Sequence, residues 1–185
     1  TSVRKHYVLI NQVLKYAVRM QILENNPAKP IQAPSNDVRE INPMSQEEVE
    51  EVLSAAKDWL YDFIYIAVYT GMRRGEILGL SWKNVDFENN KLYVRQSATV
   101  INGNEHVLKD PKTEESKRQV DINDSIANIL NERQLQQKKD KLQLAEEYNN
   151  KHDLVFAKTD GSPYLPDHAT KSFKKLARKL DLGEY

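Results

Sequence analysis

The spacing of apolar residues changes along this chain and divides it into helical and extended segments. Apolar side chains recur at helical intervals through residues 45–80, alternate with polar neighbours in parts of residues 92–122, and return to helical intervals over residues 167–180. The extended part contains Asn102 and Gly103, a pair typical of tight hairpin turns. We therefore expect a mainly α-helical protein with a small antiparallel β-sheet, that is, an α+β fold.

Prolines separate an opening helix from the rest of the chain. Residues 2–23 carry apolar side chains at helical spacing, and residues 25–27 end that pattern. The next stretch lacks periodicity and contains Pro27, Pro30, Pro34 and Pro43. Proline can neither continue a helix nor donate to a strand ladder. We predict that residues 1–26 end a preceding domain, that residues 27–42 form a linker, and that residues 43–185 form the main domain.

Local signals set the expected boundaries inside the main domain. Ser45 and Glu48 fit a capping box, and Gly71 ends a helical stretch. The sequence predicts helices over residues 45–57, 58–69, 73–80, 124–148 and 167–180, with strands in a hairpin around Asn102-Gly103 and at 118–122. Asp124 and Ser125 are the expected caps of the fourth helix, whose polar second half, residues 134–141, predicts a solvated face.

Composition excludes several classes of protein. The chain has no cysteine and only four histidines, so we expect no disulfide, no metal centre and no cofactor. No apolar run reaches the ~20 residues of a membrane span, and we expect a cytoplasmic protein with no membrane partner. The 27 basic and 27 acidic residues cancel, but a basic stripe on the last helix shows that they segregate. That stripe consists of Lys171, Lys174, Lys175 and Arg178. It could follow a DNA phosphate backbone, but a solvated face is commoner on a last helix, and we favour that interpretation.

Two arginines directly after a glycine form the most informative motif. Arg73 and Arg74 lie where a new helix begins, a position at which the helix dipole favours acidic side chains. An external anion such as a phosphate would resolve this conflict. Glu76, three residues after Arg73, could hold that guanidinium in place. Alternatively, one arginine is an ordinary surface residue and the other forms an ion pair with Glu76.

A second polar motif lies in a loop between two predicted strands. Residues 111–118 include Lys112, Lys117 and Arg118. Taken alone, a lysine in such a loop is more often a solvated charge than a functional group. The two motifs therefore need to be considered together.

Read in order, the two motifs resemble the first half of the tyrosine recombinase (phage integrase) catalytic domain. The resemblance rests on residues 70–76, 80–82 and 85–86, followed by a small sheet with residues 111–113 and 116–118, and it covers roughly residues 43–183. The opening helix and linker are similar to the end of that family's core-binding domain. The resemblance implies a site-specific recombinase of a phage or mobile element, which cuts and rejoins double-stranded DNA through a 3′-phosphotyrosyl intermediate.

The resemblance also implies roles for single residues. Arg73 matches the first active-site arginine, Glu76 the acidic residue that supports it, and Lys112 the active-site lysine. We expect DNA contacts from the other polar side chains of the two motifs, namely Arg74, Thr113, Ser116, Lys117 and Arg118. Partners implied by the family are DNA and further protomers, with a tetramer on DNA for the whole enzyme.

The family's His-x-x-Arg segment and nucleophilic tyrosine would follow Gly183, so we expect this fragment to be inactive alone. His168 lies ahead of the last helix, and Tyr164 and Tyr185 both precede the expected arginine in chain order, so none of the three is assigned a catalytic role. Two other hypotheses remain: a non-catalytic helical DNA-binding module, and a protein-interaction scaffold built on the long polar helix. The first predicts salt-sensitive DNA binding without cleavage, and the second predicts no DNA affinity.

Overall fold

The computed structural model describes residues 2–34, 43–103, 105–110 and 117–183. The chain divides into two compact units, residues 1–43 and 44–185. Among the described residues, no helix is long and apolar enough to cross a membrane.

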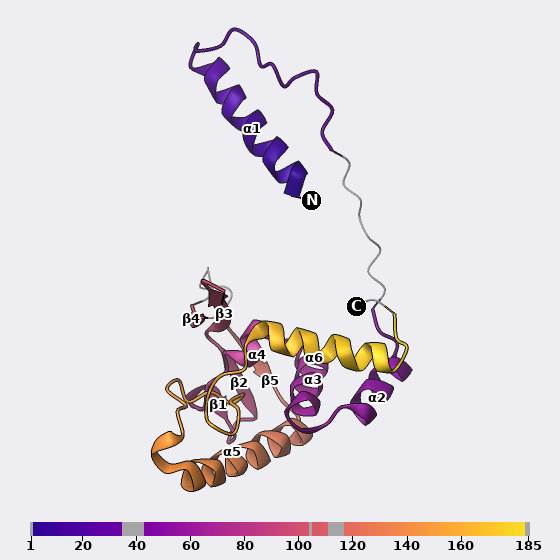
Figure 1. The fold of residues 1–185 in the computed structure, drawn as a ribbon, viewed down its shortest axis with the longest axis vertical. Helices are drawn as coiled ribbons and strands as arrows, with labels where there is room; N and C mark the ends of the chain where they lie inside the picture. The colour runs from indigo at the N-terminus through magenta and orange to yellow at the C-terminus, as the bar shows by residue number, and fades with distance from the viewer. Residues whose placement is uncertain (1, 35–42, 104, 111–116, 184–185) are drawn as a thin grey trace. The chain divides into compact units, whose positions relative to one another are not determined.

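In the first unit, α1 (Ser2–Arg19) packs against the segment that follows it (Figure 1). The Tyr7 hydroxyl donates to the Ile31 carbonyl at 3.0 Å, and the Asn26 side-chain amide donates to Asn11 Oδ1 at 2.7 Å. The helix ends four residues before the predicted Leu23, because the backbone turns at Gln21, which has a φ of 59°. Much of its apolar surface stays exposed, including Leu9 and Val13.

The second unit begins with three helices: α2 (Gln46–Ala55), α3 (Asp58–Thr70) and α4 (Arg74–Leu78). The predicted capping box is confirmed, since Ser45 Oγ accepts from the Glu48 amide and the Glu48 carboxylate accepts from the Ser45 amide. Gly71 ends α3 in the left-handed conformation, with a φ of 62° that glycine adopts without strain.

The extended residues that the structure describes form two small antiparallel sheets. A short 3₁₀ turn, Trp82–Asn84, leads into a sheet of order β1-β2-β5, whose strands are β1 (Val85–Asp86), β2 (Lys91–Val94) and β5 (Arg118–Asp121). The second sheet is a hairpin of β3 (Ser97–Ile101) and β4 (Glu105–Lys109). Its turn contains Asn102 and Gly103, both with positive φ, as predicted. The expected α+β fold is confirmed.

The chain closes with α5 (Asp124–Leu144), a 3₁₀ turn (Ala145–Glu147) and α6 (Pro166–Lys179). The predicted caps of α5 were wrong: Asn123, one residue earlier, accepts the Ile126 amide at 2.9 Å. The polar half of α5 is not wholly solvated either, because Gln137 and Asp140 are buried. Gln137 donates to the carbonyls of Leu154 and Val155, which ties α5 to the following loop.

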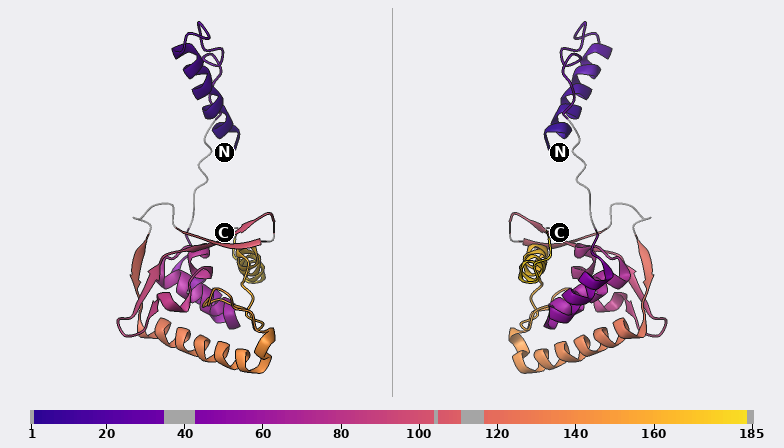
Figure 2. Two further views of the ribbon diagram at one scale, coloured as in Figure 1. Left: turned by 90° about the vertical axis from the view of Figure 1, so that its left-hand side faces the viewer. Right: turned by 90° about the vertical axis from the view of Figure 1, so that its right-hand side faces the viewer.

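The core lies between α3, α4, the β1-β2-β5 sheet and α5. Its fully buried side chains come from each of these elements and from the loop before α6, namely Ile66, Ile77, Leu78, Leu92, Leu130 and Phe156. In Figure 2, α5 runs along one end of this unit, while β5 and α6 lie on opposite sides of the central helices. This packing fixes α4 between the hairpin and α3.

Candidate active site

Arg73 and Glu76 form the centre of the site at the start of α4. The Arg73 amide donates to Glu76 Oε2 at 2.8 Å, and Arg73 Nη1 donates to Glu76 Oε1 at 3.0 Å. The Glu76 side chain is only 8% exposed, whereas that of Arg73 is 79% exposed. A buried carboxylate therefore holds a guanidinium that remains open to solvent on its other sides. The predicted pairing of these two residues is present.

Arg118 binds the same carboxylate from the first position of β5. Its Nη1 donates to Glu76 Oε1 at 3.1 Å and its Nη2 donates to Oε2 at 2.8 Å. Glu76 thus accepts four hydrogen bonds, from two arginines and one backbone amide. It links segments 42 positions apart in the chain.

These contacts determine the ionisation of Glu76. Burial alone would raise its pKa, but the hydrogen bonds from Arg118 and from the amide and guanidinium of Arg73, with the Arg118 charge, lower the pKa to about 2. In return, Glu76 raises the pKa of Arg118. The carboxylate is consequently charged at every pH at which the protein is expected to work.

The low pKa of Glu76 predicts a specific acid sensitivity. Because its pKa falls from 4.5 to about 2 on folding, Glu76 stabilises the fold above pH 4.5, and this contribution of about 3 kcal/mol is lost as the pH falls towards 2. Between pH 5 and pH 2.5, the free energy of unfolding measured with denaturant should therefore fall more for the wild type than for Glu76→Gln.

The matched control is Glu88→Gln, which removes an exposed carboxylate in the turn after β1. It should keep the wild-type pH dependence. Equal losses in the wild type and Glu76→Gln would contradict the assigned hydrogen bonding.

Arg74 points to α6 rather than to Glu76. Its Nη1 donates to the Thr170 hydroxyl and lies 3.9 Å from Asp167 Oδ1, with the side chain 46% exposed. Since α4 has only five residues, its N-terminus is not by itself taken as an anion site. An anion at this place would instead contact the exposed guanidinium of Arg73.

A hollow of about 510 Å³ lies beside Arg118 and contains Arg95, a candidate DNA-binding residue that the sequence did not suggest. It is lined by Tyr93, Arg95, Lys117 and Arg118, among others. Val94 and Arg118 form the last pair of the β2–β5 ladder, and their neighbours Arg95 and Lys117 are both exposed. The pairing register of β2 and β5 would have placed Arg95 near Arg118, but no local sequence motif indicates that register. Lys117 is exposed at the edge of this hollow, as a DNA contact requires.

The structure does not test every predicted site residue. Lys112, Thr113 and Ser116 lie outside the described residues. Among the described residues, no group of three or more potential ligands could hold a metal ion.

Close packing against β3 holds α4 in position. A Cβ added to Gly75 would lie 2.8 Å from the Ala98 carbonyl oxygen, and one added to Gly79 would lie 2.8 Å from the Ala98 amide nitrogen. Only glycine permits such backbone contact on this face of α4. The hairpin thereby determines the position of Glu76, and through it the position of Arg73.

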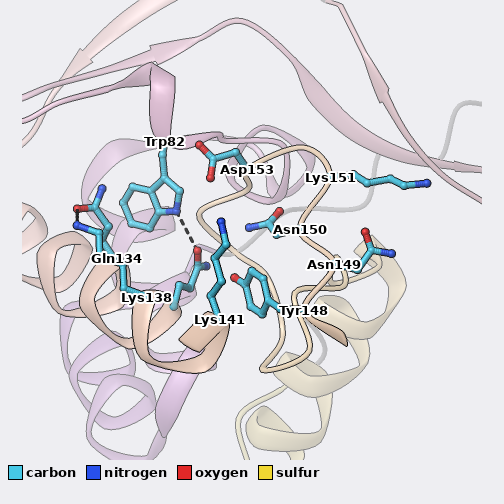
Figure 3. Close-up of a pocket in the computed structure, with 10 residues that line it drawn as sticks. Trp82, Gln134, Lys138, Lys141, Tyr148, Asn149, Asn150, Lys151 and Asp153 are labelled. Atoms are coloured by element: carbon cyan, nitrogen blue, oxygen red, sulfur yellow. Dashed lines mark hydrogen bonds between the residues drawn. The ribbon is translucent and has the colours of Figure 1, made fainter. Parts of the chain in front are cut away.

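A separate hollow of about 520 Å³ lies between α5 and the loop after it, and it contains none of the predicted site residues (Figure 3). The Trp82 indole nitrogen donates to Gln137 Oε1 at 2.9 Å across its floor. The Gln137 side-chain amide donates to two backbone carbonyls. These polar groups connect parts of the fold to one another, and Lys138 and Lys141 line the opening.

Comparison with known proteins identifies the class. Residues 42–185 match the phage integrase family. The chain is 30% identical to a tyrosine recombinase XerC-like protein of Caldanaerobacter subterraneus over 92% of its own length and 49% of the relative's. It is 26% identical to the ICEBs1 integrase of Bacillus subtilis, covering 98% of this chain and 49% of that protein. The chain thus spans about half the length of these relatives.

Solved structures show the same fold. The Tn1549 transposon integrase, solved with a circular intermediate DNA, has a TM-score of 0.76 at 20% identity, covering 96% of this chain and 57% of that one. A lambda integrase tetramer bound to a Holliday junction has a TM-score of 0.59 at 17% identity, covering 96% and 47%. This chain belongs to the phage integrase family, the tyrosine recombinases, as its sequence motifs predicted.

Proposed function

We propose that this chain is part of a site-specific DNA recombinase of a phage or other mobile element. The observation that carries the proposal is the exposed guanidinium of Arg73, held by a buried carboxylate that Arg118 shares. Arginine is always charged and its planar fork suits a phosphate. The contact with Glu76 gives this guanidinium a defined direction, which favours catalysis by charge stabilisation.

The proposed reaction exchanges one phosphodiester for another. A tyrosine hydroxyl attacks the DNA phosphorus, the bond to the 5′-oxygen breaks, and a 3′-phosphotyrosyl link forms. The tyrosine proton passes to a general base or to water as attack proceeds, and the departing 5′-oxygen takes a proton from a general acid. Arg73 stabilises the charge on the non-bridging oxygens, and Lys112 is the proposed general acid. The reverse attack by a 5′-hydroxyl rejoins the strand.

The rest of the chain is assigned to DNA binding and assembly. We propose that the first unit is the end of a core-binding domain that clamps DNA, with a linker to the catalytic domain. The DNA contacts proposed from the sequence are Arg74, Thr113, Ser116, Lys117 and Arg118. As in the lambda integrase tetramer on a Holliday junction, several protomers would assemble on DNA.

Covalent trapping tests the reaction. The whole protein that carries this chain is incubated with a duplex selected for binding from a random pool, denatured, and separated from free DNA by gel. We expect an adduct at the 3′ side of the break that resists boiling in detergent. Salt-sensitive binding without any adduct would favour the non-catalytic DNA-binding module instead.

Arg95 and Lys117 should contribute to DNA affinity through phosphate contacts. Each alanine variant should weaken binding to any duplex. It should also reduce the salt slope, that is, the slope of the logarithm of the binding constant against the logarithm of salt concentration, by about one unit, because each lost contact releases about one counterion fewer. Fluorescence anisotropy of the whole protein on a labelled duplex between 50 and 200 mM salt measures this slope.

Lys141→Ala is the matched control, since it removes an exposed lysine at the separate hollow of Figure 3. Its slope should equal the wild-type value. A reduced slope for Lys141→Ala, with normal slopes for the other two variants, would place the DNA at the hollow beside α5 instead.

A further inference from the structure

The Arg118 guanidinium faces inward, in contrast to that of Arg73. The Arg118 side chain is 35% exposed and that of Arg73 is 79% exposed. Arg118 uses both terminal nitrogens on the two oxygens of Glu76, at 3.1 and 2.8 Å. Such a two-point contact fixes the plane of both groups. A phosphate would have to compete with a buried carboxylate for this guanidinium.

We infer that Arg118 is a positioning residue, which acts on the DNA phosphate through Glu76 and Arg73 rather than by direct contact. This inference rests on the proposed recombinase function. It replaces the phosphate contact that the sequence alone suggested for Arg118.

Charge balance explains why a second arginine is needed. Arg73 and Glu76 alone form a neutral pair, in which the carboxylate would cancel much of the attraction of Arg73 for a phosphate. With Arg118 added, the three side chains carry a net charge of about +1 at neutral pH. Arg118 thus neutralises the buried carboxylate, and the exposed arginine keeps its charge for the ligand.

The position of Arg118 in the sheet makes this support rigid. Arg118 pairs with Val94 in the β2–β5 ladder, and Val94 is buried in the core. On the other side, α4 is pressed against β3 through its glycines. Glu76 is thereby held between two elements of the core, and it orients Arg73 through the 3.0 Å contact with Nη1.

The test uses Arg118→Met, which keeps the bulk of the side chain but removes its charge, and Arg118→Lys, which keeps the charge but not the two-point contact. In the chain itself, carbon-13 NMR follows the titration of Glu76. We expect its pKa to rise clearly above about 2 in Arg118→Met and less in Arg118→Lys. An unchanged titration would overturn the inference without any reference to DNA.

In the whole protein, adduct formation is measured at saturating DNA, and binding is measured separately. We expect Arg118→Met to slow adduct formation by about 10- to 100-fold, the size expected when a catalytic group is misplaced. DNA affinity should weaken, because the unbalanced Glu76 carboxylate then cancels much of the attraction of Arg73 for a phosphate, but the loss of rate should persist at saturating DNA. Arg118→Lys should restore part of the rate, and circular dichroism shows whether each variant folds.

The control is Asp121→Asn, which breaks the 3.0 Å pair between Lys91 and Asp121 on the same two strands without touching Glu76. It should react at the wild-type rate. A salt slope reduced by about one unit in Arg118→Met, with normal reaction at saturation, would make Arg118 a direct phosphate contact and overturn the inference. If the wild type forms no adduct, the recombinase proposal fails, while the Glu76 titration still decides whether Arg118 supports this carboxylate.

Discussion

Replacing Arg73 with alanine should reduce the rate of covalent adduct formation by about 10²- to 10³-fold or more, the effect of removing one donor that stabilises a transition state. The side chain is 79% exposed, so its removal should leave the fold of the chain intact. Glu76 would keep its two bonds from Arg118. The measurement is single-turnover adduct formation by the whole protein at saturating DNA.

Lys83→Ala serves as the matched control, because Lys83 is an exposed cation in the 3₁₀ turn after α4. It should leave the rate unchanged. Arg73→Lys should remain strongly impaired, since an ammonium cannot make the paired contacts of a guanidinium. Adduct formation at the wild-type rate by Arg73→Ala would remove Arg73 from the reaction.

The second large effect is expected at the contact between α4 and β3. Gly79→Ala places a methyl group 2.8 Å from the Ala98 amide nitrogen and 3.1 Å from the Ser97 carbonyl carbon, both of which are backbone atoms. The hairpin or α4 must shift, at a cost of about 1–3 kcal/mol in the free energy of unfolding. Because Glu76 lies in α4, the same shift should also slow adduct formation.

Thermal and denaturant unfolding of the chain measure this loss. Gly183→Ala is the control, since no described atom outside its chain neighbours lies within 4 Å of the added Cβ. It should change stability by less than about 0.5 kcal/mol. Equal stability of Gly79→Ala and Gly183→Ala would show that α4 and β3 are not in close backbone contact.

Local patterns in the sequence were sufficient for most elements of the fold. The capping box at Ser45, the glycine that ends α3 and the Asn102-Gly103 turn depend on neighbours within a few positions, and all three are present. The end of α1 and the cap of α5 were misplaced by one to four residues, because competing caps and turns differ little in energy.

Long-range contacts account for what could not be predicted. The Arg73–Glu76 pair is local to one helix turn, so the sequence suggested it. The contribution of Arg118 depends on the pairing of β5 with β2, which places Arg118 beside Glu76 although the two residues are 42 positions apart in the chain. No local sequence motif indicates that pairing. Gln137 was assigned to a solvated face because its partners, Trp82 and the carbonyls of the loop after α5, lie far away in the chain.

A structure of the whole protein bound to its DNA would test the central claim most directly, through the distances from the phosphate at the cleavage site to Arg73 and Lys112. We predict that one phosphate lies within hydrogen-bonding distance of both the Arg73 guanidinium and the Lys112 ammonium, while Glu76 still binds Arg73 and Arg118. Contact of the DNA with another surface, with Arg73 and Lys112 directed to unrelated places, would contradict the account.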